Sequence, residues 1–435
     1  MPFAPTQGSD RNKVWFGWCL YDWANSAFAT VILAAVLPVY FVHLVPDSGA
    51  VIPVIGRTVK ASVLWSYCVS GSMLLVALSA PYLGSIADKS GLHRHLLTAL
   101  CLIGSAATCL LFFADDHRYL LAAGLFILGN AGFALANIYY NALLPVLAGD
   151  QEMDRLSAYG FGLGYVGGGM ALLLVTLIIA KHDALGLSGR GAATRLGFLL
   201  AGLWWAGFAL PAFALLRHTR YPRRLASIPP GLKGYIRIFA EVKHYPDLLL
   251  FLVAFLFYND GIQTIIAVSA IFAREVLELS SQTVIACFLA VQFLAMPGAL
   301  AFGRAAEKLG PKRSILICLV LFMGVTMYAF YIDTATEFWV LALSVALILG
   351  GSQAASRSLF ARLIPSGRNA EFFGFYTLSG KFASILGPFL FALIGDLTGS
   401  TRTAILVLNL FFLIGIILLA LVNVERGEQD KEKPA

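Results

Sequence analysis

The sequence predicts an all-α membrane protein with twelve transmembrane helices in two pseudo-symmetric halves of six, and with both termini in the cytoplasm. The composition, the spacing of apolar segments and an internal repeat support this fold class. Of the 435 residues, 59% are hydrophobic and only 13% are charged, whereas soluble domains carry about a quarter charged residues. The mean hydropathy is +0.80. A chain of this composition has no room for a soluble domain of any size.

Apolar segments long enough to cross a bilayer recur along the whole chain. A transmembrane helix needs about 20 apolar residues, with a range of about 17 to 25. Twelve such segments are expected, at 14–43, 61–87, 92–114, 118–147, 156–181, 195–217, 247–273, 281–305, 312–332, 336–363, 370–395 and 401–423.

Lysine and arginine sort between the two sides of these helices. Most lie in the segments on one side, including Arg11, Lys13 and the basic stretch Arg217–Lys243. Basic residues mark cytoplasmic loops, so both termini are expected in the cytoplasm. The predicted organisation is an N-terminal half (1–217), a cytoplasmic linker (218–246), a C-terminal half (247–423) and a polar tail (424–435).

The linker contains a helical pattern of its own. Its residues Tyr235, Ile238, Phe239 and Val242 recur at helical spacing. This predicts a short amphipathic helix at the cytoplasmic interface.

Several classes of partner are excluded by composition. The formal net charge of +7 is explained by cytoplasmic anchoring, so no nucleic acid is expected as a partner. The six cysteines form no close pairs and no cluster with histidine, which argues against disulfides and metal sites. No feature requires a cofactor. The bilayer itself is the expected partner, and the chain is expected to be a monomer.

The most informative feature is a repeated loop motif. The first copy, GSIADKSGLHRH, contains Gly84, Asp88, Gly91 and Arg94, and the second, GRAAEKLGPKRS, contains Gly303, Glu307, Gly310 and Arg313. Each of the four pairs is separated by 219 positions. The motifs follow the second and eighth expected helices, so the two halves have the same orientation.

The two copies of G-x-x-x-D/E-K-x-G-x-x-R resemble the cytoplasmic loop motif of the major facilitator superfamily, which consists of secondary transporters built from two six-helix halves. The stretches YDWANSAF (21–28), YNALLP (140–145), YND (258–260) and GGSQAASRS (350–358) resemble the vacuole-effluxer-like family within it. That family includes autophagy-related vacuolar amino-acid effluxers. The likeness extends from Trp15 to about Leu421.

Four ionisable residues fall inside expected helices. A charge near the bilayer centre costs at least about 2.5 to 3.5 kcal/mol, so each is a candidate functional residue. Asp22 lies toward the cytoplasmic end of the first helix, Asp260 and Lys381 lie near the midplane of the seventh and eleventh, and Arg357 lies in the cytoplasmic half of the tenth.

The two acids among these residues, Asp22 and Asp260, are each followed by an amide at the same spacing. Asp22 with Asn25, and Asp260 with Gln263, are spaced i,i+3, so each acid and amide share a helix face. The offset is 238 for both the acids and the amides. This pairing argues against an accidental polar residue in the first helix.

Polar stripes also mark the fourth and tenth helices. Asn130, Asn137 and Asn141 share one face, as do Gln353, Ser356 and Arg357. The resemblance implies that helices 1, 4, 7 and 10 line a central cavity. The candidate residues for substrate or proton contact in that cavity are Asp22, Asn25, Asn137, Asn141, Asp260, Gln263, Gln353, Arg357 and Lys381.

Structural roles compete with these functional ones. Asp22 and Asn25 can fix helix packing or latch the cytoplasmic end, Asp260 and Lys381 can form an ion pair that holds the halves together, and Arg357 can extend to the cytoplasm. The resemblance assigns the motif residues Gly84, Asp88, Gly91, Arg94, Gly303, Glu307, Gly310 and Arg313 to a cytoplasmic gate of ion pairs and helix-end contacts.

The expected function is secondary active transport of a small solute by alternating access, with the site at the midplane between the halves. A carboxyl group removed from water has a raised pKa and can exchange a proton near neutral pH. Asp260 is therefore the first candidate for proton coupling and Asp22 the second. Lys381 and Arg357 suit the carboxylate of a zwitterion such as an amino acid, the class that the resemblance also implies.

Two alternatives belong to other classes. One is a sensor or scaffold that keeps the transporter fold without flux. The other is a membrane-embedded enzyme, which is disfavoured because the few histidines are scattered through loops and helix ends. The chain is expected in the cell membrane as a multi-pass protein and is not expected to be an enzyme.

Overall fold

The structure is a computed structural model. It describes residues 9–46, 48–52, 57–115, 118–217, 219, 241–382 and 386–431. Most of the linker, including Tyr235, Ile238 and Phe239 of the expected amphipathic helix, lies outside the described residues.

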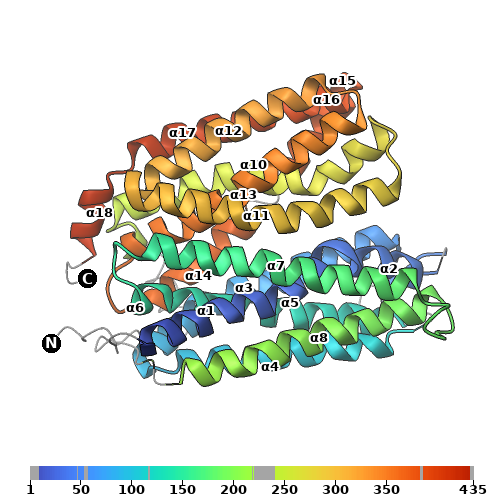
Figure 1. The fold of residues 1–435 in the computed structure, drawn as a ribbon, viewed down its shortest axis with the longest axis horizontal. Coiled ribbons are helices and arrows are strands. Elements are labelled where there is room, and N and C mark those ends of the chain that lie inside the picture. The colour runs from blue at the N-terminus through green and yellow to red at the C-terminus, as the bar shows by residue number, and fades with distance from the viewer. Residues whose placement is uncertain are drawn as a thin grey trace. The chain divides into compact units, whose positions relative to one another are not determined.

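Helices dominate the described chain (Figure 1). The predicted spans correspond to α3 (Ala61–Ser90), α4 (His93–Leu110) with the 3₁₀ turn η2 (Leu111–Phe113), α5 (Tyr119–Ala142) with α6 (Leu144–Leu147), α7 (Met153–Ala180), α8 (Arg190–Leu215), α10 (Pro246–Glu275), α11 (Ser281–Leu309), α12 (Pro311–Tyr331), α13 (Ala335–Leu363), α14 (Asn369–Phe382) with α15 (Leu386–Thr398), and α16 (Thr401–Leu406) with α17 (Leu408–Leu421). A short helix, α18 (Val424–Asp430), follows.

The first span is bent. It consists of α1 (Ser9–Ala27), the π-helix η1 (Phe28–Ala35) and α2 (Leu37–Leu44), with a 46° bend between Asp10–Ala35 and Leu37–Leu44. Pro38 lies in the first turn of α2, where it lacks the N–H needed to continue the preceding helix. Among the described residues, eleven helices are long and apolar enough to cross a membrane, and this bent pair makes twelve. The predicted all-α class with about twelve apolar spans is confirmed, whereas the side on which the termini lie stays a prediction.

One feature departs from an all-helical chain. The connection after the first span carries two short strands, β1 (Ala50–Ile52) and β2 (Arg57–Val59), paired antiparallel with Ala50 opposite Val59. Residues 53–56 lie outside the described chain.

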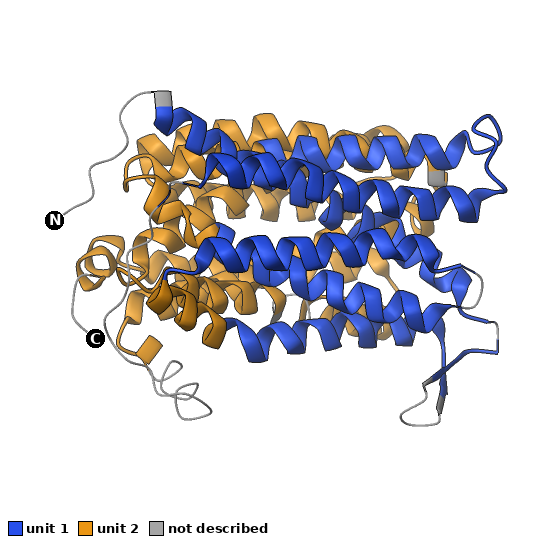
Figure 2. Cartoon of the chain, turned by 90° about the horizontal axis from the view of Figure 1, so that it is seen from below, with its two compact units in different colours: residues 1–80, 91–140, 163–220 blue, residues 81–90, 141–162, 221–435 orange. Residues whose placement is uncertain are grey.

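The contacts divide the chain into two compact units (Figure 2). Unit 1 contains residues 1–80, 91–140 and 163–220, and unit 2 contains residues 81–90, 141–162 and 221–435. Unit 2 thus includes the last turns of α3 and the first turns of α7, which belong to the first six spans. These turns lie at the end of the helices that the sequence places in the cytoplasm, called the cytoplasmic end below.

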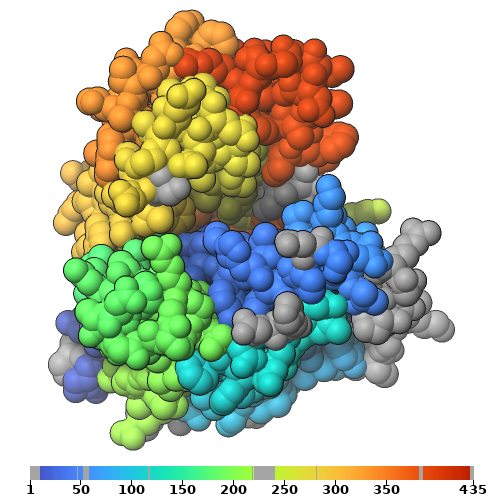
Figure 3. All heavy atoms as spheres, turned by 90° about the vertical axis from the view of Figure 1, so that its right-hand side faces the viewer, coloured from blue at the N-terminus to red at the C-terminus, as the bar shows by residue number. Residues whose placement is uncertain are grey.

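The opposite ends of the helices carry the connections from α7 to α8 and from α15 to α16. The space-filling view from that side shows both connections at the surface, coloured green and red (Figure 3). Inside each unit, close helix packing positions the polar residues described next. In unit 1, α8 packs on α1 and α4, and in unit 2, α13 packs on α11 and α17 packs on α10.

Candidate functional site

The acid and amide of the first span bind the fourth span. Asn25 Nδ2 donates a hydrogen bond to Asn137 Oδ1 at 2.8 Å. The Tyr140 hydroxyl donates to Asp22 Oδ2 at 2.9 Å. Because Asn137 and Tyr140 are themselves spaced i,i+3, two polar pairs join α1 to α5 one helical turn apart. Asp22 and Asn25 are both buried.

An aromatic contact holds Tyr140 in place. The Trp18 ring stacks on the Tyr140 ring with centroids 4.4 Å apart, and Trp18 Nε1 donates to the Tyr140 carbonyl at 2.9 Å. The sequence pointed to Asn137 and Asn141 as the lining residues of this helix and missed Tyr140. The available signal was its place next to Asn141 in YNALLP.

Glycines of α7 let that helix approach the same face of α1. A Cβ atom at Gly164 would lie 2.9 Å from Ser26 Oγ and 3.3 Å from Asp22 Cγ, and one at Gly167 would lie 2.5 Å from the Trp23 carbonyl oxygen. Small residues allow this close packing of membrane helices. The close approach of α1 therefore explains why glycine stands at these two positions of α7.

In unit 2, two neighbouring side chains of α10 bind the eleventh span on either side of residues 383–385. Asn259 Nδ2 donates to the Gly380 carbonyl near the end of α14 at 3.2 Å. Asp260 Oδ2 accepts from the Gly387 N–H of α15 at 2.9 Å. This hydrogen bond satisfies one of the two oxygens of the carboxyl group.

The Asp260 side chain is only partly satisfied. The residue is completely buried, and its Oδ1 atom has no hydrogen-bond partner among the described residues. A buried polar oxygen without a partner costs free energy, and the cost is larger when it carries charge. Unlike Asp22, Asp260 therefore has an oxygen for which the described protein provides no donor.

The two acids have equivalent surroundings in their own units. Asp22 and Ser26 face Gly164 of α7, and Asp260 and Thr264 face Gly387 of α15, where an added Cβ would lie 2.8 Å from Asp260 Oδ1. Each hydroxyl residue lies four positions after its acid. The repeat thus includes an acid, a hydroxyl residue one turn later and a facing glycine, of which the sequence analysis identified only the acid.

The remaining candidates lie in α10, α13 and α14. Lys381, Gln263 and Gln353 are half-buried. Within the described chain, Lys381 forms neither a hydrogen bond nor an ion pair, so no ion pair joins it to Asp260. Its neighbour Gly380 contacts Asn259, so the Lys381 backbone lies one residue from that contact.

Arg357 binds protein groups at the cytoplasmic end. It is 2% exposed. Its Nε donates to Ser157 Oγ at 3.0 Å, Nη2 donates to the Ser157 carbonyl at 2.8 Å, and Nη1 donates to Asn141 Oδ1 at 3.3 Å. The guanidinium also lies over the Phe161 ring, 4.1 Å from its centroid. Arg357 and Asn141, both expected as cavity residues, thus bind each other and the start of α7.

A second buried charge lies beside this contact. Asp154 of α7 is 1% exposed and accepts hydrogen bonds from the Ser358 hydroxyl and from Arg362 Nη2, both on α13. Arg362 also lies 3.9 Å from Glu428 of α18. The sequence analysis did not single out Asp154, which sits in the first turn of a helix where an acidic residue is ordinarily a helix-end charge.

The first loop motif contacts the start of α14. Both oxygens of Asp88 accept backbone hydrogen bonds, Oδ1 from Ala370 at 3.1 Å and Oδ2 from Glu371 at 2.9 Å. The motif glycine Gly84 packs against the same backbone, where a Cβ would lie 2.6 Å from the Ala370 carbonyl oxygen. Asp88 is 2% exposed. The carboxylate therefore satisfies orphan N–H groups and the positive end of the helix.

Arg368 precedes this helix and is buried between two acids. It forms ion pairs with Glu371 and with Glu241, the latter at 2.6 Å. Burial would lower the pKa of Arg368, but its hydrogen bond and charge interactions with Glu371 and Glu241 outweigh burial and raise that pKa. Arg368 therefore stays charged, and it binds the side chain of Glu371, whose backbone N–H binds Asp88.

The second loop motif makes weaker contacts with α7. Glu307 Oε1 lies 3.7 Å from Arg155 Nε, and both side chains are partly exposed. Gly303 packs against Ala158. Glu307 therefore forms a solvent-exposed ion pair, whereas Asp88 binds two buried backbone groups.

The basic ends of the two motifs differ as well. Arg94 Nη1 donates to the Arg217 carbonyl after α8 at 2.5 Å. In the second copy the corresponding contact comes from Lys312, which donates to the carbonyls of Ala420 and Val422 at 2.8 and 2.7 Å. Arg313, the motif arginine, is exposed. The resemblance implied a helix-end contact for Arg313, and the structure assigns that contact to the preceding lysine.

The second glycine of each motif copy has a backbone conformation that favours glycine. Gly91 and Gly310 have φ angles of 73° and 86°, a region that residues with a Cβ rarely adopt. Each reverses the chain between two antiparallel helices. The spacing of the motif thus reflects a turn, with the acid before it and the basic residue after it.

Solved structures of known transporters share this architecture. The chain matches the fucose transporter FucP in its outward conformation, with a TM-score of 0.70 and 13% identity over 95% of this chain and 99% of that one. It matches the human organic anion transporter MFSD10 with a TM-score of 0.68 and 17% identity over 95% and 100%. The fold is that of a major facilitator superfamily transporter.

Comparison with protein sequences narrows the class. The model of the family described as vacuole effluxer Atg22 like matches residues 10–432, and the chain belongs to that family. A Bacillus subtilis protein described as an uncharacterized MFS-type transporter, YxiO, is 34% identical over 411 residues, which cover 94% of each chain. Autophagy-related protein 22 of Coccidioides immitis is 24% identical over 96% of this chain and 88% of that protein.

These comparisons confirm the resemblance seen in the sequence. They place the chain among multi-pass membrane transporters of the secondary type, not among enzymes. They do not test the assignment of individual site residues, which rests on the geometry above.

Proposed function

We propose that this transporter moves a small zwitterion, such as an amino acid, by alternating access, with a proton as the coupling ion. The substrate class rests on the resemblance to amino-acid effluxers and on the charges available in unit 2. Asp260 offers a carboxyl group and Lys381 an ammonium group, and a zwitterion requires both.

The observation that supports proton coupling is the environment of Asp260. One carboxyl oxygen binds the Gly387 N–H, and the other is buried without a partner among the described residues. A proton on that oxygen removes the buried charge. Asp22 is less suited to this role, because the Tyr140 hydroxyl already binds its carboxylate.

Lys381 is the proposed contact for the solute carboxylate. It is half-buried and has no acid partner in the described chain, so its ammonium group is available for a ligand. Arg357, the other cation considered for this role, is already bound to Ser157 and Asn141. We therefore assign Arg357 to the cytoplasmic gate, together with Asp88 and Asp154.

Alternating access requires these gate contacts to break. They join residues 81–90 and 141–162 to α13 and α14, so they hold one end of the transport path in a single state. We propose that the protein acts as a monomer in the cell membrane, with both termini in the cytoplasm.

The test is transport by purified protein in proteoliposomes. Labelled amino acids are supplied with and without a pH gradient, to the protein and to the Asp260→Asn variant. The proposal predicts gradient-driven accumulation by the unmodified protein and its loss in the variant. Asp396→Asn, an exposed acid of α15, is the matched control and should transport normally.

Two results would overturn parts of the proposal. Gradient-driven flux that survives Asp260→Asn removes the coupling role of this carboxyl group. A protein that binds amino acids but moves none across the membrane, in either direction, would instead be a sensor with the transporter fold.

A further inference from the structure

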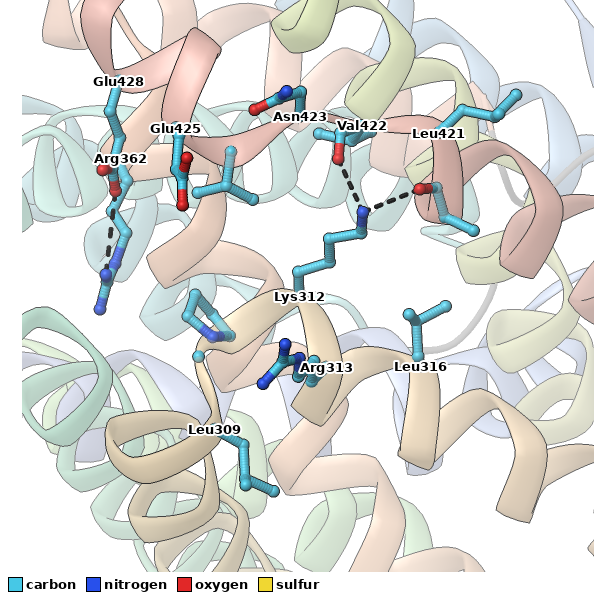
Figure 4. A pocket seen from close by; sticks show the side chains of 14 residues that line it. Leu309, Lys312, Arg313, Leu316, Arg362, Leu421, Val422, Asn423, Glu425 and Glu428 are labelled. Atoms are coloured by element: carbon cyan, nitrogen blue, oxygen red, sulfur yellow. Dashed lines mark hydrogen bonds and ion pairs between the residues drawn. The ribbon is translucent and has the colours of Figure 1, made fainter.

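The short helix α18 (Val424–Asp430) is held at the cytoplasmic end by charged contacts. Four of its seven residues, VERGEQD, are charged. A hollow of about 810 Å³ lies between α18, the start of α12 and the end of α17, so α18 and α12 are not packed tightly together. Figure 4 shows this hollow, with Glu425 on α18 and Lys312 on α12. A helix with few buried apolar contacts can detach locally at a low cost in free energy.

One set of contacts anchors α18 to the last six spans. Arg426 binds both carboxylate oxygens of Asp247 at the start of α10, with Nε donating to Oδ2 and Nη2 donating to Oδ1 at 2.9 Å. The Asn423 N–H also donates to Asp247 Oδ1, at 2.8 Å. Gly427 packs so closely against Leu363 at the end of α13 that an added Cβ would clash with that side chain. These contacts fix α18 to α10 and α13.

An ion pair with α13 adds to this anchor. Glu428 Oε1 lies 3.9 Å from Arg362 Nη1, as the dashed line in Figure 4 shows. The Asp247 side chain is 1% exposed, and a buried carboxylate that loses its cation is costly, so the Arg426 contact is expected to hold. All of these contacts lie within the last six spans and can persist when the cytoplasmic end opens.

The residue after α18 binds the first six spans. Lys431 Nζ lies 3.1 Å from Asp150 Oδ2 and 3.3 Å from Asp150 Oδ1. The Lys431 carbonyl accepts from the Ser366 N–H, just after α13, at 3.3 Å. Asp150 lies in the connection between α6 and α7, which joins the fourth span to the fifth. Residues 424–431, called the strap below, thus begin on α10 and end on a connection of the first six spans.

We propose that the strap restrains opening of the cytoplasmic end. The inference rests on the alternating access proposed above, in which residues 141–162 separate from α13. Asp150 then moves away from Asp247, Leu363 and Ser366, to which the strap is anchored. The ion pair between Lys431 and Asp150 therefore breaks each time this end opens, and the strap favours the closed state.

The exposure of the ion pair sets the size of the effect. The side chains of Lys431 and Asp150 are 19% and 46% exposed, so water screens their attraction. Loss of a pair of this kind should change the ratio of open to closed protein about two- to fivefold. The strap therefore adjusts how often the end opens, and the buried contacts of Asp88 and Asp154 keep the larger share of closure.

The experiment measures opening of the full chain in detergent, without solute or pH gradient. Ala354→Cys, in a background without the native cysteines, is 1% exposed on α13, and its carbonyl binds Ser157 of α7. A hydrophilic maleimide reaches it when α7 and α13 separate. We expect Lys431→Gln and Asp150→Asn each to raise the alkylation rate about two- to fivefold. The double variant should react no faster than either single one, because both remove the same pair.

Exchange of the two charges, Asp150→Lys with Lys431→Asp, should return the rate toward that of the unmodified chain. The matched control is Glu425→Gln, which removes an exposed acid of α18 that forms no ion pair within the described residues. It should react like the unmodified chain, and thermal unfolding checks that each variant is folded.

Two results would overturn the proposal. One is an unchanged alkylation rate in both single variants, which would make the strap a structural element without influence on opening. The other is a double variant whose acceleration is the product of the two single effects, which would show that the residues act independently. Neither result depends on the solute or on Asp260, so failure of the strap and failure of proton coupling are separate outcomes.

Discussion

The two copies of the loop motif should contribute unequally to closure of the cytoplasmic end. Asp88→Asn removes the charge that faces the first turn of α14 and turns one acceptor oxygen into a donor. Hydrogen bonds to charged groups are worth about 1.5 to 3 kcal/mol, and a charge at a helix N-terminus adds about 0.3 to 1 kcal/mol. The closed state should therefore lose about 2 to 4 kcal/mol of stability relative to the open state.

The second copy provides a matched control. Glu307→Gln removes a partly exposed ion pair with Arg155 at 3.7 Å, and such surface pairs contribute about 0 to 1 kcal/mol. Since 1.4 kcal/mol is a factor of ten in an equilibrium constant, Asp88→Asn should increase opening by a factor of about 30 or more. Glu307→Gln should increase it less than about fivefold.

Opening can be followed by alkylation of a cysteine placed in the gate. Ala361→Cys, in a background without the native cysteines, introduces a thiol on α13 at a position that is 3% exposed. A hydrophilic maleimide reacts only when this region opens, so the labelling rate reports the open fraction. The same background without the added cysteine gives the non-specific rate. Equal acceleration by Asp88→Asn and Glu307→Gln would refute the reasoning.

Three further outcomes are expected for stability in detergent. Gly167→Ala should destabilise the fold by about 1 to 3 kcal/mol through overpacking, whereas Gly207→Ala, which has open space around it, should be neutral or stabilising; equal unfolding temperatures would contradict the packing argument. A double-mutant cycle of Asn25→Ala with Asn137→Ala should give a coupling of about 0.6 kcal/mol and below about 2 kcal/mol, and zero coupling would exclude their hydrogen bond. Arg426→Gln should lower the unfolding temperature, because Arg426 pairs with a buried carboxylate at the start of α10, and an unchanged temperature would show that α18 does not dock there.

Some of these features follow from local sequence alone. Apolar length predicted the number and order of the helices, since the bilayer demands about 20 apolar residues per span. The motif glycines Gly91 and Gly310 were identified by spacing, and their positive φ angles agree with a turn. The bend at Pro38 was not predicted, because a proline near a helix end is compatible with a straight span.

The candidate site was harder to predict, because the partners of a polar side chain in a membrane lie on other helices. Periodicity placed Asp22, Asn25, Asp260 and Arg357 on helix faces, but it could not distinguish a ligand-facing group from one bound to a neighbouring helix.

The sequence by itself determined which residues are polar within apolar helices and how they repeat. Only the tertiary structure decided what they bind. It placed Arg357 against Ser157 and Asn141, and Asp88 at the start of α14, and it left one oxygen of Asp260 without a partner in the described chain. The physical reason is that hydrogen bonding depends on distances of about 3 Å between residues that lie up to 283 positions apart in the chain. Helical spacing in the sequence predicts contacts only between residues on neighbouring turns of the same helix.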